Sequence, residues 1–421
     1  MKTSLLLLSA FAASALAAAP VIRSGSVTID QSAGRSVAVS YELQNEPAVV
    51  TVAFFTNGVP VGEANCTRLC GDVNKLVQTG ERSLLWVPDR DWTFVLPDVA
   101  VTAKVTAWAT NSPPELMVID LCAGKTVRYY TSTNALPYGG LANDIYRSEK
   151  MVFRKIPAAQ VTWRMGSDNT TSGDKSYRVA DAEVPHLVTL TEDFYLAVFE
   201  LTVEQYLMQS PKMTGTANTV NPTGDYKPLV YVTYDAIRGS TLLWPGDDHA
   251  VDANCFIGRL RTLTGMDTLD LPTDAQWEFA CRAGFGSPTG TDNTKYQTQW
   301  WSSLIDPRAW YSATSGYSSD NKHAKHRVGS LLPNHWGLYD MQGNVSEYCL
   351  DYWSEGDAFS DGSSVTDPKG PATSTYDGKR VVRNGAFNSE MKSMRPAVRG
   401  IGYLEAKSQV GFRLAAGAYA R

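Results

Sequence analysis

The first third of the chain alternates apolar and polar positions with a period of two. β-Branched or aromatic runs separated by turn residues predict short strands. About seven such runs in about a hundred residues, with no helical periodicity, predict an immunoglobulin-like or fibronectin-like β-sandwich over residues 20–122. The clearest runs lie at residues 26–29, 36–41, 49–55, 83–87, 92–96 and 101–109.

Two tryptophans of these runs, Trp86 and Trp108, are expected in the core of the sandwich. Sandwich cores routinely bury such residues, because an indole removes a large apolar area from water. A carbohydrate-binding face is the alternative function of the two side chains.

After the strand region the pattern changes twice. Residues 123–150 carry clustered Tyr, Ser, Thr, Pro and Gly and predict a linker. Residues 151–421 are rich in Trp, Tyr and Gly with few long periodic stretches, which predicts a second domain of low regularity. Two helices are expected there, one after the N-cap Thr202 and one from the N-cap Thr273 to Gly284.

The N-terminus has the pattern of a signal peptide. Lys2 precedes an apolar stretch over residues 5–16, and the small residues Ala17, Ala18 and Ala19 follow. We therefore expect residues 1–19 to be removed on export, and the protein to be secreted, periplasmic or on the cell surface. The stretch is shorter than the ~20 residues that span a bilayer, so no membrane span is expected. An uncleaved N-terminal anchor is the alternative.

Composition and charge restrict the classes of partner. With 43% hydrophobic and 19% charged residues, the chain lies far from the composition of disordered proteins. The 38 basic against 43 acidic residues provide no basic excess for phosphate binding, so we expect no nucleic-acid partner. Disulfides are chemically available to an exported protein. Either one bridge crosses between the two regions or two thiols stay free, because three cysteines lie in each: Cys66, Cys70 and Cys122, then Cys255, Cys281 and Cys349.

Several phrases follow one another in the second region. They include Met165-Gly166-Ser167, Pro185-His186, Leu271-Pro272-Thr273-Asp274, Asn334-His335-Trp336-Gly337, Arg383-Asn384-Gly385-Ala386 and Gly411-Phe412-Arg413. In this order they resemble the formylglycine-generating enzyme, or sulfatase-modifying factor, family. The resemblance implies a compact C-type-lectin-like domain with a surface cleft for an extended peptide, and hence an α+β protein with an N-terminal all-β sandwich. The sandwich also resembles a module that precedes such domains in some bacterial secreted proteins.

The resemblance also shows where the family's copper site is missing. In its oxidases a cysteine pair just after the Gly-Gly-Ser phrase holds Cu(I), a soft ion that requires thiolates. The resemblance places Ser389 and Met394 at or near these two positions, and the last cysteine of the chain is Cys349. We therefore assign no catalytic residue, do not expect copper, and expect Met394 and Met391 to line the core or the cleft.

A calcium site is expected between residues 340 and 347. The carboxylates of Asp340 and Glu347 flank Gly343, and a tight turn there would bring the carbonyls of Gly343 and Val345 inward. This pattern also matches a calcium site of the family, where calcium is structural. The alternative is that both carboxylates simply accept hydrogen bonds from neighbouring backbone amides.

Candidates for the lining of the cleft come from their position relative to the family's active segment. They are Trp353, Phe387, Asn388, Ser389, Met394 and Arg395. Four arginines of this stretch either recognise an anion or pair with acids inside the domain: Arg383, Arg395, Arg399 and Arg413. His323 and His326 are expected in a solvated loop.

The function expected from these observations is binding. A calcium-supported lectin-like scaffold without the copper cysteines would present a cleft to an extended peptide, a glycan or a protein partner. The alternative is a formylglycine-generating or related oxidoreductase that acts on a cysteine-containing peptide through a non-standard metal site. A structural component of the cell envelope, without a cleft, is a third reading.

Overall fold

The structure is a computed structural model, and it describes residues 18–32, 36–88, 100–122, 126–167, 183–210, 213, 215–284, 305–316, 323–354, 364–374, 376–402 and 406–418. Most of the expected signal peptide and the expected strand at 92–96 lie outside these residues. The chain forms two compact units, Met1–Val61 with Arg68–Ala109, and Gly62–Thr67 with Thr110–Arg421. Among the described residues, no helix has the length and apolar character to cross a membrane.

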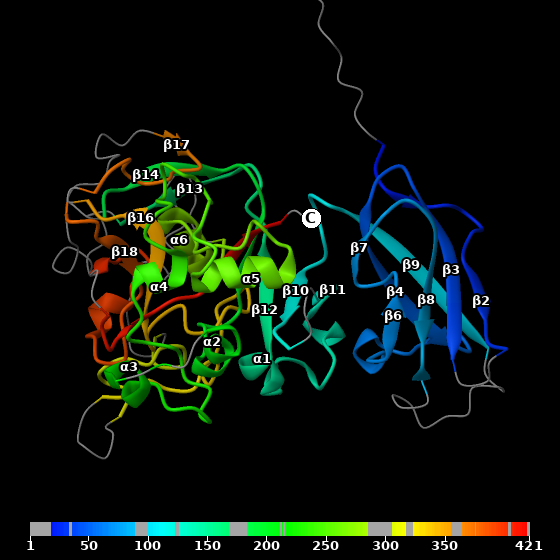
Figure 1. Ribbon diagram of the computed structural model, residues 1–421, viewed down its shortest axis with the longest axis horizontal. Coiled ribbons are helices and arrows are strands. Elements are labelled where there is room, and N and C mark those ends of the chain that lie inside the picture. The colour runs from blue at the N-terminus through cyan, green and yellow to red at the C-terminus, as the bar shows by residue number, and fades with distance from the viewer. Residues whose placement is uncertain are drawn as a thin grey trace, which may run out of the picture. The chain divides into compact units, whose positions relative to one another are not determined.

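The first unit consists of two antiparallel sheets (Figure 1). One sheet has the order β1-β3-β8-β6 with β2 on β3, and the other has the order β5-β4-β7 with β9 on β4. Their strands are β1 (Val21–Ile22), β2 (Thr28–Asp30), β3 (Val37–Gln44), β4 (Ala48–Thr56), β5 (Val59–Pro60), β6 (Leu69–Gly71), β7 (Lys75–Val77), β8 (Gly80–Trp86) and β9 (Val101–Ala109).

The period-two pattern of this unit buries one face of each strand. On β3 the side chains of Val37, Val39, Tyr41 and Leu43 are buried, and the residues between them are more exposed. Phe54 of β4 stacks on Trp86 of β8 with ring centroids 4.5 Å apart, which joins the two sheets face to face. Trp86 is fully buried as expected, whereas Trp108 is half-buried and donates a 2.9 Å hydrogen bond to Thr51.

The second unit contains three sheets and short helices. The sheets have the orders β11-β10-β12-β15-β21, β13-β14-β17 and β19-β18-β16-β20. The strands are β10 (Leu116–Asp120), β11 (Thr126–Tyr130), β12 (Lys150–Ile156), β13 (Val161–Met165), β14 (His186–Leu190), β15 (Phe194–Ala197), β16 (Ser346–Tyr352), β17 (Ser364–Thr366), β18 (Arg380–Arg383), β19 (Arg399–Gly402), β20 (Val410–Gly411) and β21 (Ala415–Gly417). The helices are α1 (Ile145–Ser148), α2 (Val203–Gln209), α3 (Gly215–Val220), α4 (Tyr234–Arg238), α5 (Phe256–Thr264) and α6 (Asp274–Arg282), with 3₁₀ turns at Glu63–Asn65, Thr133–Ala135, Gly140–Ala142 and Met391–Met394.

The division between the units differs from the expected one. β10 pairs antiparallel with both β11 and β12, so residues from Thr110 onward belong to the second unit. The segment 123–150, expected as a linker, contributes β11 and α1 to that unit. Its run of residues 126–130 pairs in register with the apolar β10. In an extended linker these backbone groups would have no hydrogen-bond partners in a neighbouring strand.

Both expected helices form where their caps predict. Thr202 and Thr273 each accept a hydrogen bond from the backbone N–H three residues on, and Gln205 and Gln276 complete the two capping boxes. α6 ends at Ala283, whose φ of 50° makes it the left-handed residue just before the expected Gly284.

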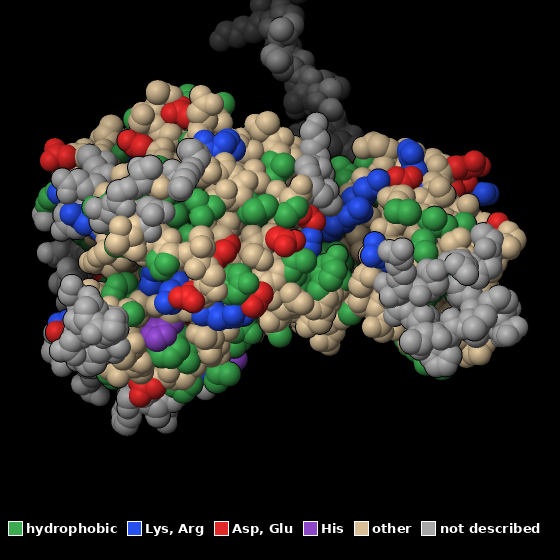
Figure 2. All heavy atoms as spheres, turned by 60° about the horizontal axis from the view of Figure 1, so that its bottom comes forward, with side chains coloured by type: hydrophobic (Ala, Val, Ile, Leu, Met, Phe, Trp, Pro, Cys, Tyr) green, Lys and Arg blue, Asp and Glu red, His purple; other side chains and the backbone are tan. Residues whose placement is uncertain are grey.

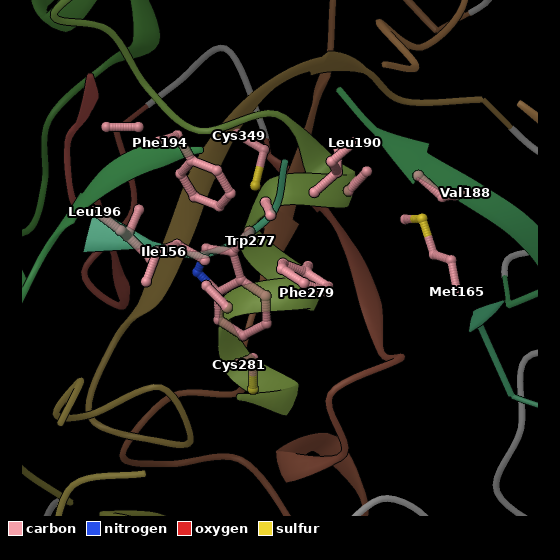
Figure 3. Packing of buried hydrophobic residues seen from close by; sticks show 14 of the residues in the cluster. Ile156, Met165, Val188, Leu190, Phe194, Leu196, Trp277, Phe279, Cys281 and Cys349 are labelled. Atoms are coloured by element: carbon pink, nitrogen blue, oxygen red, sulfur yellow. The ribbon is translucent and has the colours of Figure 1, made fainter. Parts of the chain in front are cut away.

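α6 supplies the centre of the largest described core cluster of the second unit. Figure 3 shows Trp277, Phe279 and Cys281 of this helix among side chains from β14, β15 and β16. The indole of Trp163 lies 5.4 Å from the ring of Phe279, centroid to centroid. Trp277 and Glu278 anchor this packing, since both are at most 1% exposed.

Charges on the surface are mixed. On the face that Figure 2 shows, acidic and basic side chains lie in small interspersed groups without a field of one sign.

Candidate functional site

The segment after β18 holds Ser389 and Met394, which the resemblance places at or near the family's copper ligands. Ser389 is half-buried on a turn, where its hydroxyl accepts a 2.9 Å hydrogen bond from the N–H of Ala386. Its N–H donates to the carbonyl of Ala386, and its own carbonyl accepts from Ser312. The serine side chain therefore stabilises the turn.

Met394 lies in the interior. Its side chain is 1% exposed and packs with Ile305, Ala309 and Tyr311. A Cβ added at Gly385 would come within 2.0 Å of the Met394 methyl carbon, far inside van der Waals contact. The methionine occupies this space because residue 385 has no side chain, and its thioether is part of the packing.

The other cleft candidates divide into two groups. Trp353 is 6% exposed and belongs to the core cluster around α6. Arg395 is buried and forms hydrogen bonds of 2.7 and 2.9 Å with Glu183. Phe387 and Asn388 remain half-buried and exposed, respectively. Of the six candidates, the structure thus leaves Phe387, Asn388 and Ser389 accessible, together on one turn.

The loop between Asp340 and Glu347 closes around the side-chain amide of Asn384. Its Nδ2 donates to the carbonyls of Gly343 at 2.6 Å and of Asp340 and Val345 at 3.1 Å each. Its Oδ1 accepts from the N–H of Gly343. Two of these carbonyls were expected to face a calcium ion, and in this structure they face the amide.

The two carboxylates of the expected site also have protein partners. Glu347 accepts hydrogen bonds of 2.7 and 2.6 Å from Arg413 and one of 2.6 Å from the indole of Trp277. Asp340 accepts a 2.7 Å bond from the N–H of Gly329. No group of three or more His, Cys, Asp or Glu side chains suited to a metal occurs among the residues that the structure describes. A calcium ion would have to displace the Asn384 amide from the carbonyls of Gly343 and Val345, and calcium binding here stays a prediction.

Burial dominates the electrostatics of this loop. It raises the pKa of Asp340 to about 6, against smaller lowering effects from the Gly329 N–H and Arg413. Glu200, fully buried, bonds the side chain of Asn344 and the N–H of Val345. Burial, together with Asp340 and Glu347, raises its pKa well above the usual value. Arg413 therefore pairs with Glu347, whereas burial favours the protonated form of Asp340 and Glu200.

The four arginines of the C-terminal stretch pair with acids inside the domain, as one of the two alternatives predicted. Their partners are Asp274 and Glu278 for Arg383, Glu183 for Arg395, Asp274 for Arg399 and Glu347 for Arg413. Burial raises the pKa of the Asp274 carboxyl, but Arg383 and Arg399 outweigh it and hold that pKa below the usual value. These four guanidinium groups therefore form ion pairs inside the domain.

The histidine pair expected in a solvated loop is held by local contacts. The imidazole of His326 stacks on Trp310 with centroids 3.8 Å apart and contacts the carbonyl of Ser315 at 2.6 Å. His323 contacts the hydroxyl of Ser315 at 3.1 Å.

The thiols near the core are poorly suited to redox or nucleophilic chemistry. Cys281 and Cys349 are buried, and burial is the main cause that raises their pKa, to about 12 for Cys281. A thiol with so high a pKa carries almost no thiolate near neutral pH. Cys255 instead caps α5, where its sulfur accepts a hydrogen bond from the N–H of Gly258.

The sequence did not predict a cavity of about 860 Å³ in the second unit. It lies between the β14–β15 turn, the loop around Trp244 to Ala250, the segment after α5 and the start of α6. His249 and Asp270 line it and form a hydrogen-bonded pair with a 2.9 Å separation. The Asp-Asp-His run at 247–249 was the only local signal, and its partner Asp270 is distant in sequence.

The chain is similar in sequence to several known proteins. The chain is 32% identical over 126 residues to the formylglycine-generating enzyme of Thermomonospora curvata, which covers 28% of this chain and 38% of that enzyme. It is 29% identical over 194 residues to the chaperone protein LppX of Paenibacillus barcinonensis, which covers 40% of this chain and 65% of that protein. The solved structure of PvdO from Pseudomonas aeruginosa aligns with a TM-score of 0.45 and 20% identity over 63% of this chain and 94% of that chain.

The alignment to the curated formylglycine-generating enzyme thus spans well under half of that enzyme's length. Residues 154–418, which make up most of the second unit, match the Sulfatase-modifying factor enzyme 1-like domain. The chain belongs to the sulfatase-modifying factor family.

Proposed function

We propose that this protein is an exported, non-catalytic binding module of the sulfatase-modifying factor family. The observation that carries the proposal is the buried packing of the side chain at position 394. Its methionine is packed among Ile305, Ala309 and Tyr311 against the bare backbone of Gly385. A side chain committed in this way is a poor ligand, and the serine at position 389 offers a hard oxygen where Cu(I) prefers sulfur.

The two cysteines buried near the core of the second unit are poor replacements for the thiolate pair. No cysteine follows Cys349, and burial raises the pKa of both Cys281 and Cys349. A binding role also agrees with the match to a relative named as a chaperone, although its activity belongs to that protein. The turn that carries Phe387, Asn388 and Ser389 is the accessible part of the expected cleft and the first surface to test for contact with a peptide, glycan or protein.

The test compares metal content and oxygen chemistry in the full mature chain. The purified protein is supplied with copper, iron and calcium, and its metals are measured by elemental analysis. Oxygen uptake is then followed with a Cys-x-Pro-x-Arg peptide, and the formylglycine-generating enzyme of Thermomonospora curvata serves as the positive control. We expect no stoichiometric copper or iron and no uptake.

Tight copper binding together with peptide oxidation would overturn the proposal and support the oxidoreductase alternative. The binding surface is tested separately on a peptide library and a glycan array. A Phe387→Ala/Asn388→Ala variant should lose the ligands that the wild-type chain retains. Equal retention by both proteins would exclude this turn as the binding surface.

A further inference from the structure

The cavity of about 860 Å³ in the second unit presents one imidazole on a rigid support. The Nδ1 atom of His249 lies 2.9 Å from Oδ2 of Asp270. Asp270 is 2% exposed at its side chain, whereas the side chain of His249 is 46% exposed. The carboxylate accepts from Nδ1–H, and this contact selects the tautomer in which Nε2 is the acceptor.

A buried arginine fixes both members of this pair. Nε and Nη2 of Arg238 donate to Asp270 at 3.0 and 3.2 Å. Its Nη1 and Nη2 also donate to the carbonyls of Leu242 and Asp248, at 3.1 and 2.7 Å. One side chain thus holds the carboxylate and the loop that carries His249 in a single arrangement.

The ring of His249 has a second restraint. It packs on the buried indole of Trp244 with centroids 4.8 Å apart. The Trp244 indole donates a 2.9 Å bond to the carbonyl of Lys369, which joins this loop to the segment after β17. The imidazole therefore has a fixed orientation before any ligand arrives, and binding does not have to order it.

The charges of the lining favour a cation. Acidic side chains outnumber basic ones in the lining. The basic residues are Arg261 and Lys369. The acidic residues are Glu192, Asp193, Asp247, Asp248, Asp267, Asp270 and Asp367. Several of them accept bonds from backbone amides, as Asp193 does from Ala158 and Asp247 from Leu243, and these contacts leave the negative charge in place. Lys369 is paired with Asp248 at 2.6 Å. A concave surface with this excess of one sign concentrates ions of the other.

We propose that this cavity binds a ligand with a primary ammonium or guanidinium group, and that Nε2 of His249 accepts one of its N–H bonds. The carboxylates of the lining compensate its positive charge. A bare divalent metal is disfavoured, because among the described residues no three His, Cys, Asp or Glu side chains are grouped for one. The inference does not depend on the proposed loss of oxidase chemistry, since the cavity lies apart from Ser389 and Met394.

Such a group occurs in two sources, a free polyamine and the basic side chains of a peptide. Isothermal titration of the full chain with spermidine and with a tetra-arginine peptide distinguishes them, and a tetra-glutamate peptide is the charge control. We expect binding of at least one cationic probe, weakened by salt, and no binding of the anionic peptide. Binding of spermidine alone would indicate a small-molecule site, and binding of the peptide alone would indicate a peptide site.

Variants locate the binding. His249→Phe keeps a ring on Trp244 but removes the acceptor, and it should weaken binding at least tenfold because a hydrogen bond to a charged donor is lost. Asp267→Asn is exposed, should leave folding intact and should weaken binding severalfold. Glu390→Gln removes an exposed charge outside the cavity and should have no effect. The proposal is wrong if neither cation binds, if His249→Phe and Asp267→Asn bind like the wild type, or if Glu390→Gln weakens binding equally.

Discussion

Replacing Asn384 by glycine tests whether an amide, and not a cation, closes the loop between Asp340 and Glu347. The residue has a φ of 70°, which glycine adopts without strain, so the change removes the side-chain contacts and otherwise adds only the smaller effect of a more flexible unfolded chain. The side chain of Asn384 contacts four backbone groups, but its two amide hydrogens can satisfy only two of the three carbonyls fully. About three buried hydrogen bonds are therefore lost, each worth about 1 kcal/mol net, with more if a carbonyl stays unsatisfied.

The expected loss is about 2–4 kcal/mol of unfolding free energy, which corresponds to a fall in Tm on the order of 3–6 °C for a unit of this size. Denaturant unfolding followed by fluorescence and thermal unfolding followed by circular dichroism both measure it. Asn388→Gly, on the exposed turn nearby, is the matched control and should change stability by less than about 1 kcal/mol. The wild-type Tm should not respond to a chelator or to added calcium.

Two results would refute the reasoning. A loss below about 1 kcal/mol in Asn384→Gly would mean that the amide contacts do not stabilise the loop. A wild-type Tm that falls on chelation and recovers with calcium would restore the expected calcium site, with Asn384 displaced from the carbonyls.

Three further changes follow from the same region. Met394→Ala should cost about 2–5 kcal/mol in denaturant unfolding, because it leaves a void beside Gly385, and a smaller loss would mean that the site collapses or is not packed. Arg413→Met should cost about 3–5 kcal/mol, because Glu347 would stay buried without its partner; a double variant with Glu347→Leu should recover much of that loss, and failure to recover would assign the cost to packing. In the folded state the pKa of Asp340 is about 6, against an ordinary value of 3.8. The folded state therefore binds this proton more tightly than the unfolded state does. The stability that the proton provides is lost as pH rises from about 4 through 6. Asp340→Asn should therefore flatten the decline of unfolding free energy over this range, and an unchanged pH profile would contradict the assignment.

Local patterns predicted the elements that local forces determine. The caps Thr202 and Thr273 placed α2 and α6 correctly, because capping acts within a few residues. The period-two runs, which are also local, placed the main strands of the first unit.

Features that depend on distant residues were not predictable in this way. Segment 126–130 has the composition of a loop and becomes a strand because β10 offers it an edge. The sequence could not decide whether Arg413 recognises an anion or pairs with an acid inside the domain, because its partner Glu347 is 66 residues away in sequence. His249 gained its orientation from Asp270 and Arg238, which only the folded chain brings together. Tertiary contacts decided each of these outcomes.

Two consecutive residues connect the segment of Ser389 and Met394 to the loop between Asp340 and Glu347. Asn384 supplies the amide that satisfies the carbonyls of Asp340, Gly343 and Val345, and Gly385 leaves the space that the Met394 side chain fills. The segment that would carry metal ligands in the family's oxidases is thereby joined to the acidic loop by packing and hydrogen bonds. Introducing cysteines at 389 and 394 alone would remove the Met394 packing while Asn384 still held the loop. Such a variant should lose stability before it gains a competent copper site, because the buried packing of the Met394 side chain is lost, whereas Ser389 lies on the accessible turn.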